Sequence, residues 1–218
     1  LPLIDLSHLR EHPKWVVGFS DVTMLHLALG RLGVESLHAT MPGKFRFGAD
    51  EKPEAIVSDE SLRSALFGRW TRIDAAAHPL NVSGTARGRL AGGNLSLLCS
   101  AIGTPEQPDF DTPTVLFIEE IGEQMYRLDR MMQQLERSGI LAKCKAVLVG
   151  HFTDMLGQKH FGVWDPCDII AAYVRPLGIP VVFGIPAGHE DPNVALYMGR
   201  EVAVTVNDCL LYTSDAAD

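Results

Sequence analysis

The stretch Trp15-Val-Val-Gly-Phe-Ser-Asp21 decides how this chain is expected to fold. A short β-branched run ends at Gly18, Ser20 follows, and apolar residues then recur at helical spacing, at Val22, Leu25, Leu29 and Leu32. A strand that turns directly into a helix around a serine places the hydroxyl at the rim of a sheet. There it lies beside the free backbone N–H groups of the helix N-terminus. The stretch therefore has the layout of a serine nucleophile in an α/β fold.

A simpler interpretation of the same stretch is that Ser20 only caps the helix, because serine is among the preferred N-cap residues. The sequence Gly18-Phe-Ser-Asp21 also lacks the second glycine of the usual hydrolase turn. Taken alone, the stretch favours capping over catalysis, and the remainder of the chain has to decide between the two.

Two further residues occupy positions comparable to that of Ser20. Glu119 ends the apolar run Thr114–Ile118, and His189 follows the apolar run Pro180–Gly184. In open α/β sheets, ligands bind at the carboxyl ends of the strands, where all three residues are expected. A serine hydroxyl needs a base to become nucleophilic, and the base needs an acid to orient it. The sequence thus offers a serine, an acid and a histidine, but their spacing does not establish that they meet.

Five stretches that lie within residues 1–205 occur in the order of a known family: Pro13–Thr23, Gly88–Leu95, Leu116–Glu123, Tyr126–Met131 and Pro186–His189. They resemble the LD-carboxypeptidases, the muramoyltetrapeptide carboxypeptidase family of serine peptidases, which includes the microcin C immunity peptidases. The family's nucleophile corresponds to Ser20, its acid to Glu119 and its base to His189. The resemblance therefore implies a Ser-Glu-His triad. The Asp21 backbone N–H, at the N-terminus of the helix, would be one oxyanion donor.

The resemblance also implies a division into domains. Residues 1–66 would be the C-terminal part of an N-terminal Rossmann-like domain of the class I glutamine amidotransferase type. Residues 67–85 would form a linker, and residues 86–208 a C-terminal mixed α/β domain that carries the acid and the base. The active site would lie between the two domains. Residues 209–218 show no convincing strand pattern, and we expect this tail to be a sequencing or assembly scar.

Family members carry more sequence before the position that is Leu1 here, including the first strands of the N-terminal domain and a glycine-rich segment near the nucleophile. We therefore expect the chain to be truncated at its N-terminus, with the activity belonging to the full-length protein. The second oxyanion donor would come from the upstream glycine-rich segment.

The activity implied by the resemblance is release of the terminal D-alanine from murein tetrapeptides in cell-wall recycling, by a homodimer without a cofactor. One alternative is hydrolysis of a peptide–nucleotide or acyl-sulfamoyl adenylate by a microcin-immunity type of enzyme. Trp70 and Trp164 are the tryptophans outside the nucleophile strand that could stack on its nucleobase. A second alternative is an inactive fragment or a non-catalytic binding module.

Three small or polar residues, Gly92, Gly93 and Asn94, fall near the active site by resemblance and are candidate substrate-binding residues. As a bare sequence they are a common turn.

Glu120 and Glu123 compete with Glu119 for the role of the acid. Neighbouring strand positions face opposite ways, so Glu119 and Glu120 cannot both reach His189 if the strand continues through them. Glu123 is expected in the first turn of a helix over residues 124–138, where an acidic residue is favoured.

Charge and composition exclude several classes of function. With 27 acidic and 19 basic residues the net charge is −8, which argues against nucleic-acid binding. No apolar stretch is long enough to cross a bilayer. Four cysteines without a C-x-x-C pair indicate reduced thiols and a cytoplasmic location: Cys99, Cys144, Cys167 and Cys209.

Histidines outside the turn at residue 189 give little indication of function. His151, Asp154 and His160 have a spacing that fits no helix face, so we expect no metal site there. His26 is expected on a helix face after Ser20. The remaining histidines carry no functional signal: His8, His12, His38 and His78.

Overall fold

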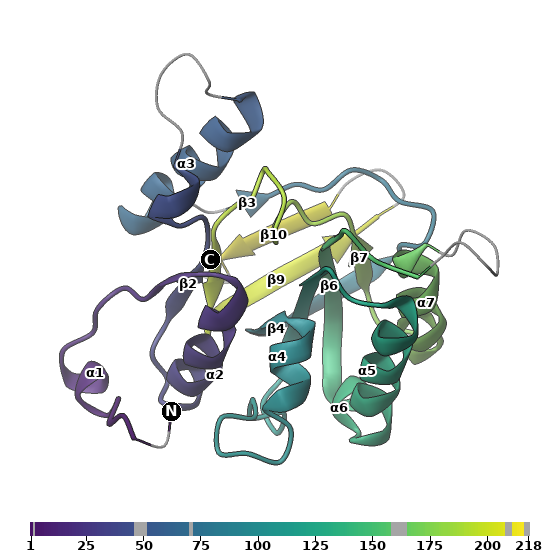
Figure 1. Cartoon of the computed structure of the whole chain (residues 1–218), viewed down its shortest axis with the longest axis horizontal. Helices are drawn as coiled ribbons and strands as arrows, with labels where there is room; N and C mark the ends of the chain where they lie inside the picture. Colours follow the sequence, from purple (N-terminus) through teal and green to yellow (C-terminus); the bar gives the residue numbers. More distant parts are fainter. Residues whose placement is uncertain (2, 46–51, 70–71, 158–164, 208–210, 216–218) are drawn as a thin grey trace.

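The strands of the chain form two sheets (Figure 1) in a computed structural model, which describes residues 1, 3–45, 52–69, 72–157, 165–207 and 211–215. The small sheet has the order β1 (Val17–Gly18), β2 (Ser36–His38) and β8 (Leu196–Met198). The large sheet has the order β3 (Arg72–Ile73), β10 (Leu211–Asp215), β9 (Glu201–Val206), β4 (Gly84–Asn94), β5 (Thr114–Ile121), β6 (Cys144–Thr153) and β7 (Val181–Phe183). Strands β4 to β7 are parallel, whereas β9 and β10 are antiparallel to their neighbours.

The helical segments are connected to these strands in an alternating α/β pattern. They are α1 (His8–Glu11), η1 (Ser20–Val22), α2 (Thr23–Arg31), η2 (Pro42–Lys44), α3 (Pro53–Leu66), α4 (Leu95–Ser100), α5 (Met125–Arg137), α6 (Ile140–Lys143), α7 (Pro166–Val174) and η3 (Arg175–Leu177). The predicted helix after Ser20 and the one over residues 124–138 are both confirmed. Gly139, in the left-handed conformation at φ 75°, follows α5 at the position expected for a helix stop.

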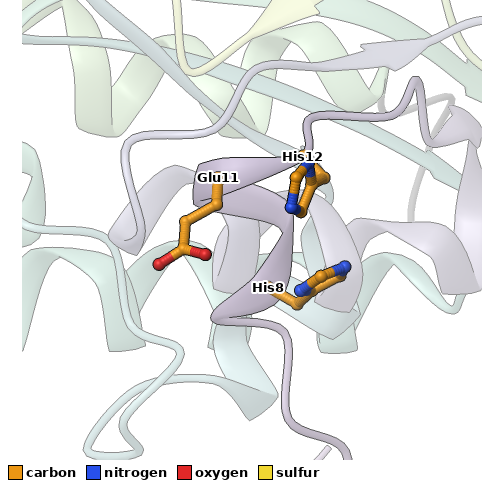
Figure 2. A group of neighbouring side chains, drawn as sticks. All are labelled: His8, Glu11 and His12. Carbon is orange, nitrogen blue, oxygen red and sulfur yellow. The ribbon is translucent and has the colours of Figure 1, made fainter.

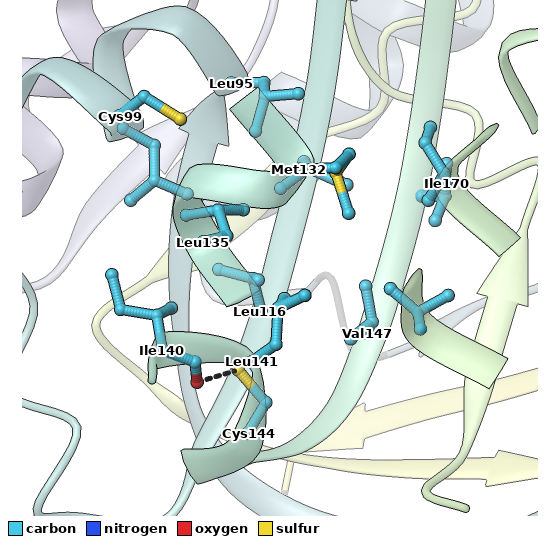
Figure 3. Close-up of a cluster of buried hydrophobic side chains, with 14 of the residues drawn as sticks. Leu95, Cys99, Leu116, Met132, Leu135, Ile140, Leu141, Cys144, Val147 and Ile170 are labelled. Atoms are coloured by element: carbon cyan, nitrogen blue, oxygen red, sulfur yellow. Dashed lines mark hydrogen bonds between the residues drawn. The ribbon is translucent and has the colours of Figure 1, made fainter. Parts of the chain in front are cut away.

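Alternation along β5 separates two hydrophobic cores. Leu116 and Ile118 face the helices α4 to α7, where they pack against α5 residues such as Met132 (Figure 3). Val115 and Phe117 face the opposite way and pack with residues of β8 and of the segment that precedes it. Because β5 is buried on both faces, a charged residue on it must find a partner within the protein.

Several elements differ from the expectation. The tail was expected to lack a strand, but β10 pairs antiparallel with β9, with Leu211 opposite Val206, and also with β3. The expected linker 67–85 contains β3 and the start of β4 at Gly84, so this part of the chain belongs to the large sheet. The short elements α1 and β2 were not predicted, because runs of three or four residues show too little periodicity.

The small sheet contains strands from both sides of the predicted domain boundary. Strand β1 runs parallel to β2, with α2 between them, which forms a β-α-β unit. On its other edge β2 pairs antiparallel with β8, which lies within the expected C-terminal domain. The predicted boundaries and the amidotransferase-like description of residues 1–66 stay predictions. Among the described helices, none is long and apolar enough to span a membrane.

Candidate active site

Residues 18–20, which we call the elbow, form the sharp turn between β1 and the helical segment that follows. Ser20 has φ 59°, a left-handed conformation that a residue with a side chain rarely adopts. At Gly18, a Cβ atom would lie 2.7 Å from Cγ2 of Val22, so only glycine lets the strand fold back so closely on the helix. A strained backbone at a half-buried serine is typical of a functional site rather than of an ordinary helix cap.

A buried histidine, His26, is hydrogen-bonded to the backbone of the elbow. Nε2 of His26 lies 2.9 Å from the carbonyl oxygen of Gly18, and Nδ1 lies 2.8 Å from the hydroxyl oxygen of Ser36 in β2. Burial lowers the pKa of His26 to about 4, so the ring is neutral at pH 7. Its single N–H therefore donates to Gly18, and Nδ1 accepts from Ser36. His26 lies on α2, as expected, and its buried ring joins the nucleophile strand to its neighbour.

The acid and the base are in direct contact. Oε2 of Glu119, on β5, lies 2.7 Å from Nδ1 of His189, which is in the loop after β7. Glu119 is fully buried, whereas the side chain of His189 is 11% exposed. Because Nδ1 faces the carboxylate, the other ring nitrogen, Nε2, is left for a proton-donating partner.

Gly188 makes this contact possible. It has φ 139°, and a Cβ atom there would lie 3.1 Å from Oε2 of Glu119 and 3.0 Å from Cβ of His151. A side chain at this position would press on the carboxylate that holds His189.

The elbow and the histidine loop lie next to each other. The ring of Phe19, the residue before Ser20, meets the ring of His189 edge to face, with 5.0 Å between the ring centroids. This contact brings the segments of all three predicted site residues together, since His189 also holds Glu119. A direct contact between the Ser20 hydroxyl and His189 stays a prediction, as does the role of the Asp21 N–H in the first turn of η1.

The second carboxylate of β5 has a different set of partners. Glu120 accepts hydrogen bonds from Nδ2 of Asn94 (2.8 Å), from the backbone N–H of Ser96 (2.8 Å) and from that of Ile121 (3.0 Å). Burial raises the pKa of Glu120 despite these bonds. The carboxylate of Glu120 therefore binds the N-terminus of α4, and it does not compete for His189. Glu123 lies just before the N-cap of α5 and not in its first turn.

The candidate substrate-binding residues are packed against other parts of the protein. A Cβ atom at Gly92 would lie 1.9 Å from the carbonyl oxygen of Phe117, and one at Gly93 would lie 2.5 Å from Oγ1 of Thr23. Oγ1 of Thr23 also accepts a hydrogen bond from the N–H of Asn94 at 3.0 Å. The side chain of Asn94 caps α4 and binds Glu120. Gly93 lets β4 approach α2 just after the elbow, whereas Gly92 lies against the backbone of β5. A role in substrate binding stays a prediction.

A second buried histidine near the site could not be found from the sequence. His38, at the end of β2, is fully buried and packs edge to face on Phe117 with 5.0 Å between ring centroids. Neither of its ring nitrogens has a hydrogen-bond partner among the residues that the structure describes. Burial first, and then the charges of His26, His189 and His151, lower the pKa of His38. Its ring is therefore neutral, and its centroid also lies 6.1 Å from that of Phe19 in the elbow.

Hydrogen bonds from α3 hold the loop that carries His189. The hydroxyl of Ser58 lies 2.8 Å from the backbone N of Asn193, whose N–H donates to it, and 3.1 Å from Oδ1 of Asp191. Oδ1 of Asn193 in turn accepts from the N–H of Gly188 at 3.0 Å. This chain of contacts runs from α3 to the residue before His189. Nothing in the sequence around Ser58 indicates such a role, because serines are common on helix surfaces.

The remaining residues considered from sequence do not join the site as a group. His151 is partly buried, and desolvation lowers its pKa. Asp154 lies at a turn after β6 with φ 52°. Cys99, Cys144 and Cys167 are free thiols within the described part of the chain. Trp70, His160, Trp164 and Cys209 lie outside the described residues.

Comparison with known proteins agrees with this arrangement. The family model of the LD-carboxypeptidase N-terminal domain matches residues 1–39, and the family model of the LD-carboxypeptidase C-terminal domain matches residues 87–204. The elbow lies in the first match, and Glu119 and His189 lie in the second. Together the matches include strands of both sheets, although β3 and β10 lie outside them.

Individual relatives extend the comparison. The Bacillus subtilis protein named probable murein peptide carboxypeptidase is 34% identical over 202 residues, which cover 92% of this chain and 63% of that protein. The crystal structure of muramoyltetrapeptide carboxypeptidase from Oxalobacter formigenes has a TM-score of 0.86 and 30% identity, covering 98% of this chain and 72% of that one.

A more distant structure, MccF in complex with glutamyl sulfamoyl guanosine, has a TM-score of 0.79 at 20% identity and shares the fold; it covers 98% of this chain and 71% of that one. This chain spans about three fifths of the length of the curated relatives that it matches first. Since the C-terminal domain match alone covers more than half of the residues, the chain belongs to the LD-carboxypeptidase family.

Proposed function

We propose that this protein is a serine-type LD-carboxypeptidase that uses Ser20, Glu119 and His189 as a catalytic triad. The observation that carries the proposal is the 2.7 Å contact between the buried Glu119 carboxylate and Nδ1 of His189. A buried carboxylate on one ring nitrogen fixes the tautomer and stabilises the imidazolium that forms when the other nitrogen takes a proton. The strained elbow with Ser20, next to the Phe19–His189 contact, supports the serine as the nucleophile.

In the proposed reaction, Oγ of Ser20 attacks the carbonyl carbon of the scissile amide, and its proton passes to Nε2 of His189. The negative charge on the carbonyl oxygen is stabilised by the Asp21 N–H at the start of η1, with a further donor from the upstream segment. His189 then gives its proton to the departing amine, which leaves an acyl-enzyme on Ser20. Water, deprotonated by His189, releases the acid and restores the serine.

The substrate that we propose is a murein tetrapeptide, which would lose its terminal D-alanine. The names of the Bacillus subtilis and Oxalobacter formigenes relatives support this choice. The fold shared with MccF keeps an acyl-sulfamoyl nucleotide as the alternative to be tested. The Rossmann-like description of residues 1–66, the homodimer and the cytoplasmic location belong to this proposal as well, and each rests on the family resemblance.

The proposal is tested with two substrates and two forms of the protein. This chain, and a version extended to the length of its relatives, are assayed for release of D-alanine from murein tetrapeptide and for cleavage of an aminoacyl sulfamoyl adenylate. We expect D-alanine release by the extended version and none by its His189→Ala variant. Preferential cleavage of the adenylate would assign the microcin-immunity type, and no turnover of either substrate by the extended version would leave a binding module.

A further inference from the structure

Three side chains project from the short helix α1 and its C-cap residue, on the N-terminal side of the elbow (Figure 2): His8, Glu11 and His12. Their spacing of i, i+3 and i+4 places them on one side of a helical turn. Each offers one nitrogen or oxygen, and these three atoms lie within 4.8 Å of one another. The rings of His8 and His12 have centroids 4.7 Å apart. All three side chains are exposed, so nothing blocks the approach of an ion.

The three groups match the preference of a particular class of cation. Two imidazole nitrogens and one carboxylate oxygen suit Zn²⁺, Ni²⁺ and Cu²⁺, whereas Mg²⁺ and Ca²⁺ select oxygen ligands. Zinc binds nitrogen at about 2.0–2.1 Å, so nitrogens that share one ion lie roughly 3.3 Å apart in a tetrahedron. Exposed side chains can close the remaining gap by rotation, and water can occupy the fourth position.

The backbone already holds the two histidines in register. The N–H of His12 donates to the carbonyl of His8 at 3.0 Å, so the ligand residues themselves close the helical turn. The N–H of Ser7 donates to Oδ1 of Asp5 at 2.9 Å, just before the helix. The Asp5 carboxylate thus adds negative charge just before α1, which favours a cation there.

We propose that His8, Glu11 and His12 form a binding site for one divalent transition-metal ion of the Zn²⁺ class. A helix of four residues is too short to be stable in isolation, and an ion that bridges its two histidines would hold the turn closed. The chain runs from this turn into β1 and the elbow within a few residues. The site does not depend on the proposed peptidase activity.

The experiment is a calorimetric titration of the untagged chain with ZnCl₂ at pH 7.5, because a polyhistidine tag would bind the same ion. We expect saturable binding of one ion per chain. At pH 5.5 the affinity should fall more than about tenfold, since protonated imidazole does not bind metal. His8→Ala and His12→Ala should each weaken binding at least about tenfold, and Glu11→Gln less, because removing one of two nitrogen ligands leaves a single imidazole.

Two control variants separate this site from others. His78→Ala removes a histidine far from α1 in sequence, and His189→Ala removes the one that contacts Glu119; both should leave the zinc affinity unchanged. With Cu²⁺, electron paramagnetic resonance should show coupling to two nitrogens, reduced to one in His8→Ala and in His12→Ala. Absence of saturable zinc binding, or binding that the α1 variants do not weaken, would overturn the proposal.

Discussion

Glu119 and Glu120 are consecutive residues of β5, yet their carboxylates lie on opposite faces of the large sheet. Glu119 contacts Nδ1 of His189, whereas Glu120 accepts hydrogen bonds from Asn94, Ser96 and Ile121 at the N-terminus of α4. The alternation of a strand thus separates two buried acids into one that orients a base and one that anchors a helix.

Exchanging each acid for its amide should therefore give opposite results. Glu119→Gln in the extended version should cut D-alanine release by about 10³–10⁴-fold, because an amide neither fixes the tautomer of His189 nor stabilises its cation. Glu120→Gln should leave most of the activity but lower the free energy of unfolding by about 1–3 kcal/mol, since one buried N–H would lose its acceptor. Turnover and urea unfolding of both variants measure this; the reverse ranking of rates would show that Glu120 is the acid.

Two substitutions of Ser20 separate catalysis from backbone strain. Ser20→Ala and Ser20→Gly should both abolish hydrolysis, because neither carries a nucleophile. Glycine adopts φ 59° without a steric penalty, so Ser20→Gly should be more stable than Ser20→Ala by roughly 1 kcal/mol. Thermal melts give the difference, with the exposed Ser100→Ala as a control that should keep both stability and rate. Activity in Ser20→Ala would remove this serine from the mechanism.

A pair of serines on α3 tests the support of the histidine loop. Ser58→Ala removes the acceptor of the Asn193 N–H, and Ser61→Ala removes that of the Ala195 N–H at 3.0 Å. Both are buried, so each should lower the free energy of unfolding by about 1–3 kcal/mol.

Only Ser58 connects through Asn193 to Gly188, and Ser58→Ala should therefore lower kcat more than Ser61→Ala does, at equal KM. Equal kcat values for the two variants would mean that α3 stabilises the fold without positioning His189.

The buried His26 predicts a dependence of stability on pH. Its pKa is lowered from 6.5 to about 4 in the folded protein, so between these values the unfolded chain binds a proton that the folded one does not. Stability is therefore fully present above pH 6.5 and is lost as the pH falls towards 4, by on the order of 3 kcal/mol from this residue. His26→Gln should reduce the slope between pH 6.5 and 4.5, measured by urea unfolding. An unchanged slope would mean that His26 does not titrate in this range.

The long elements could be predicted from the sequence because their patterns repeat. Helix α5 shows its buried face in Leu128, Met132 and Leu135, and β5 is an uninterrupted apolar run that ends in two acids. Ser20, Glu119 and His189 could be selected as candidates for the same reason, because each follows an apolar run. The structure places Glu119 in contact with His189.

Contacts between distant segments produce no repeating pattern in the sequence, so they could not be predicted from it. His38 in a three-residue strand, Ser58 on a helix and the pairing of β2 with β8 depend on residues that are more than a hundred positions away in the chain. Single-sequence periodicity reports the local burial of an element and not its partner, so these contacts became evident only in the structure. The same limit hid α1, whose single turn carries the His8–His12 pair.

The pairing of β2 with β8 has a consequence for synthesis on the ribosome. Ser36 lies opposite Met198, so the small sheet cannot be completed until the chain has been translated past that residue. The elbow is synthesised long before β8, the strand that completes its sheet. Closing the long loop between β2 and β8 is slow relative to local folding. A nascent chain would therefore expose the unpaired edge of β2 while the residues between β2 and β8 are synthesised, which is when a chaperone could bind it.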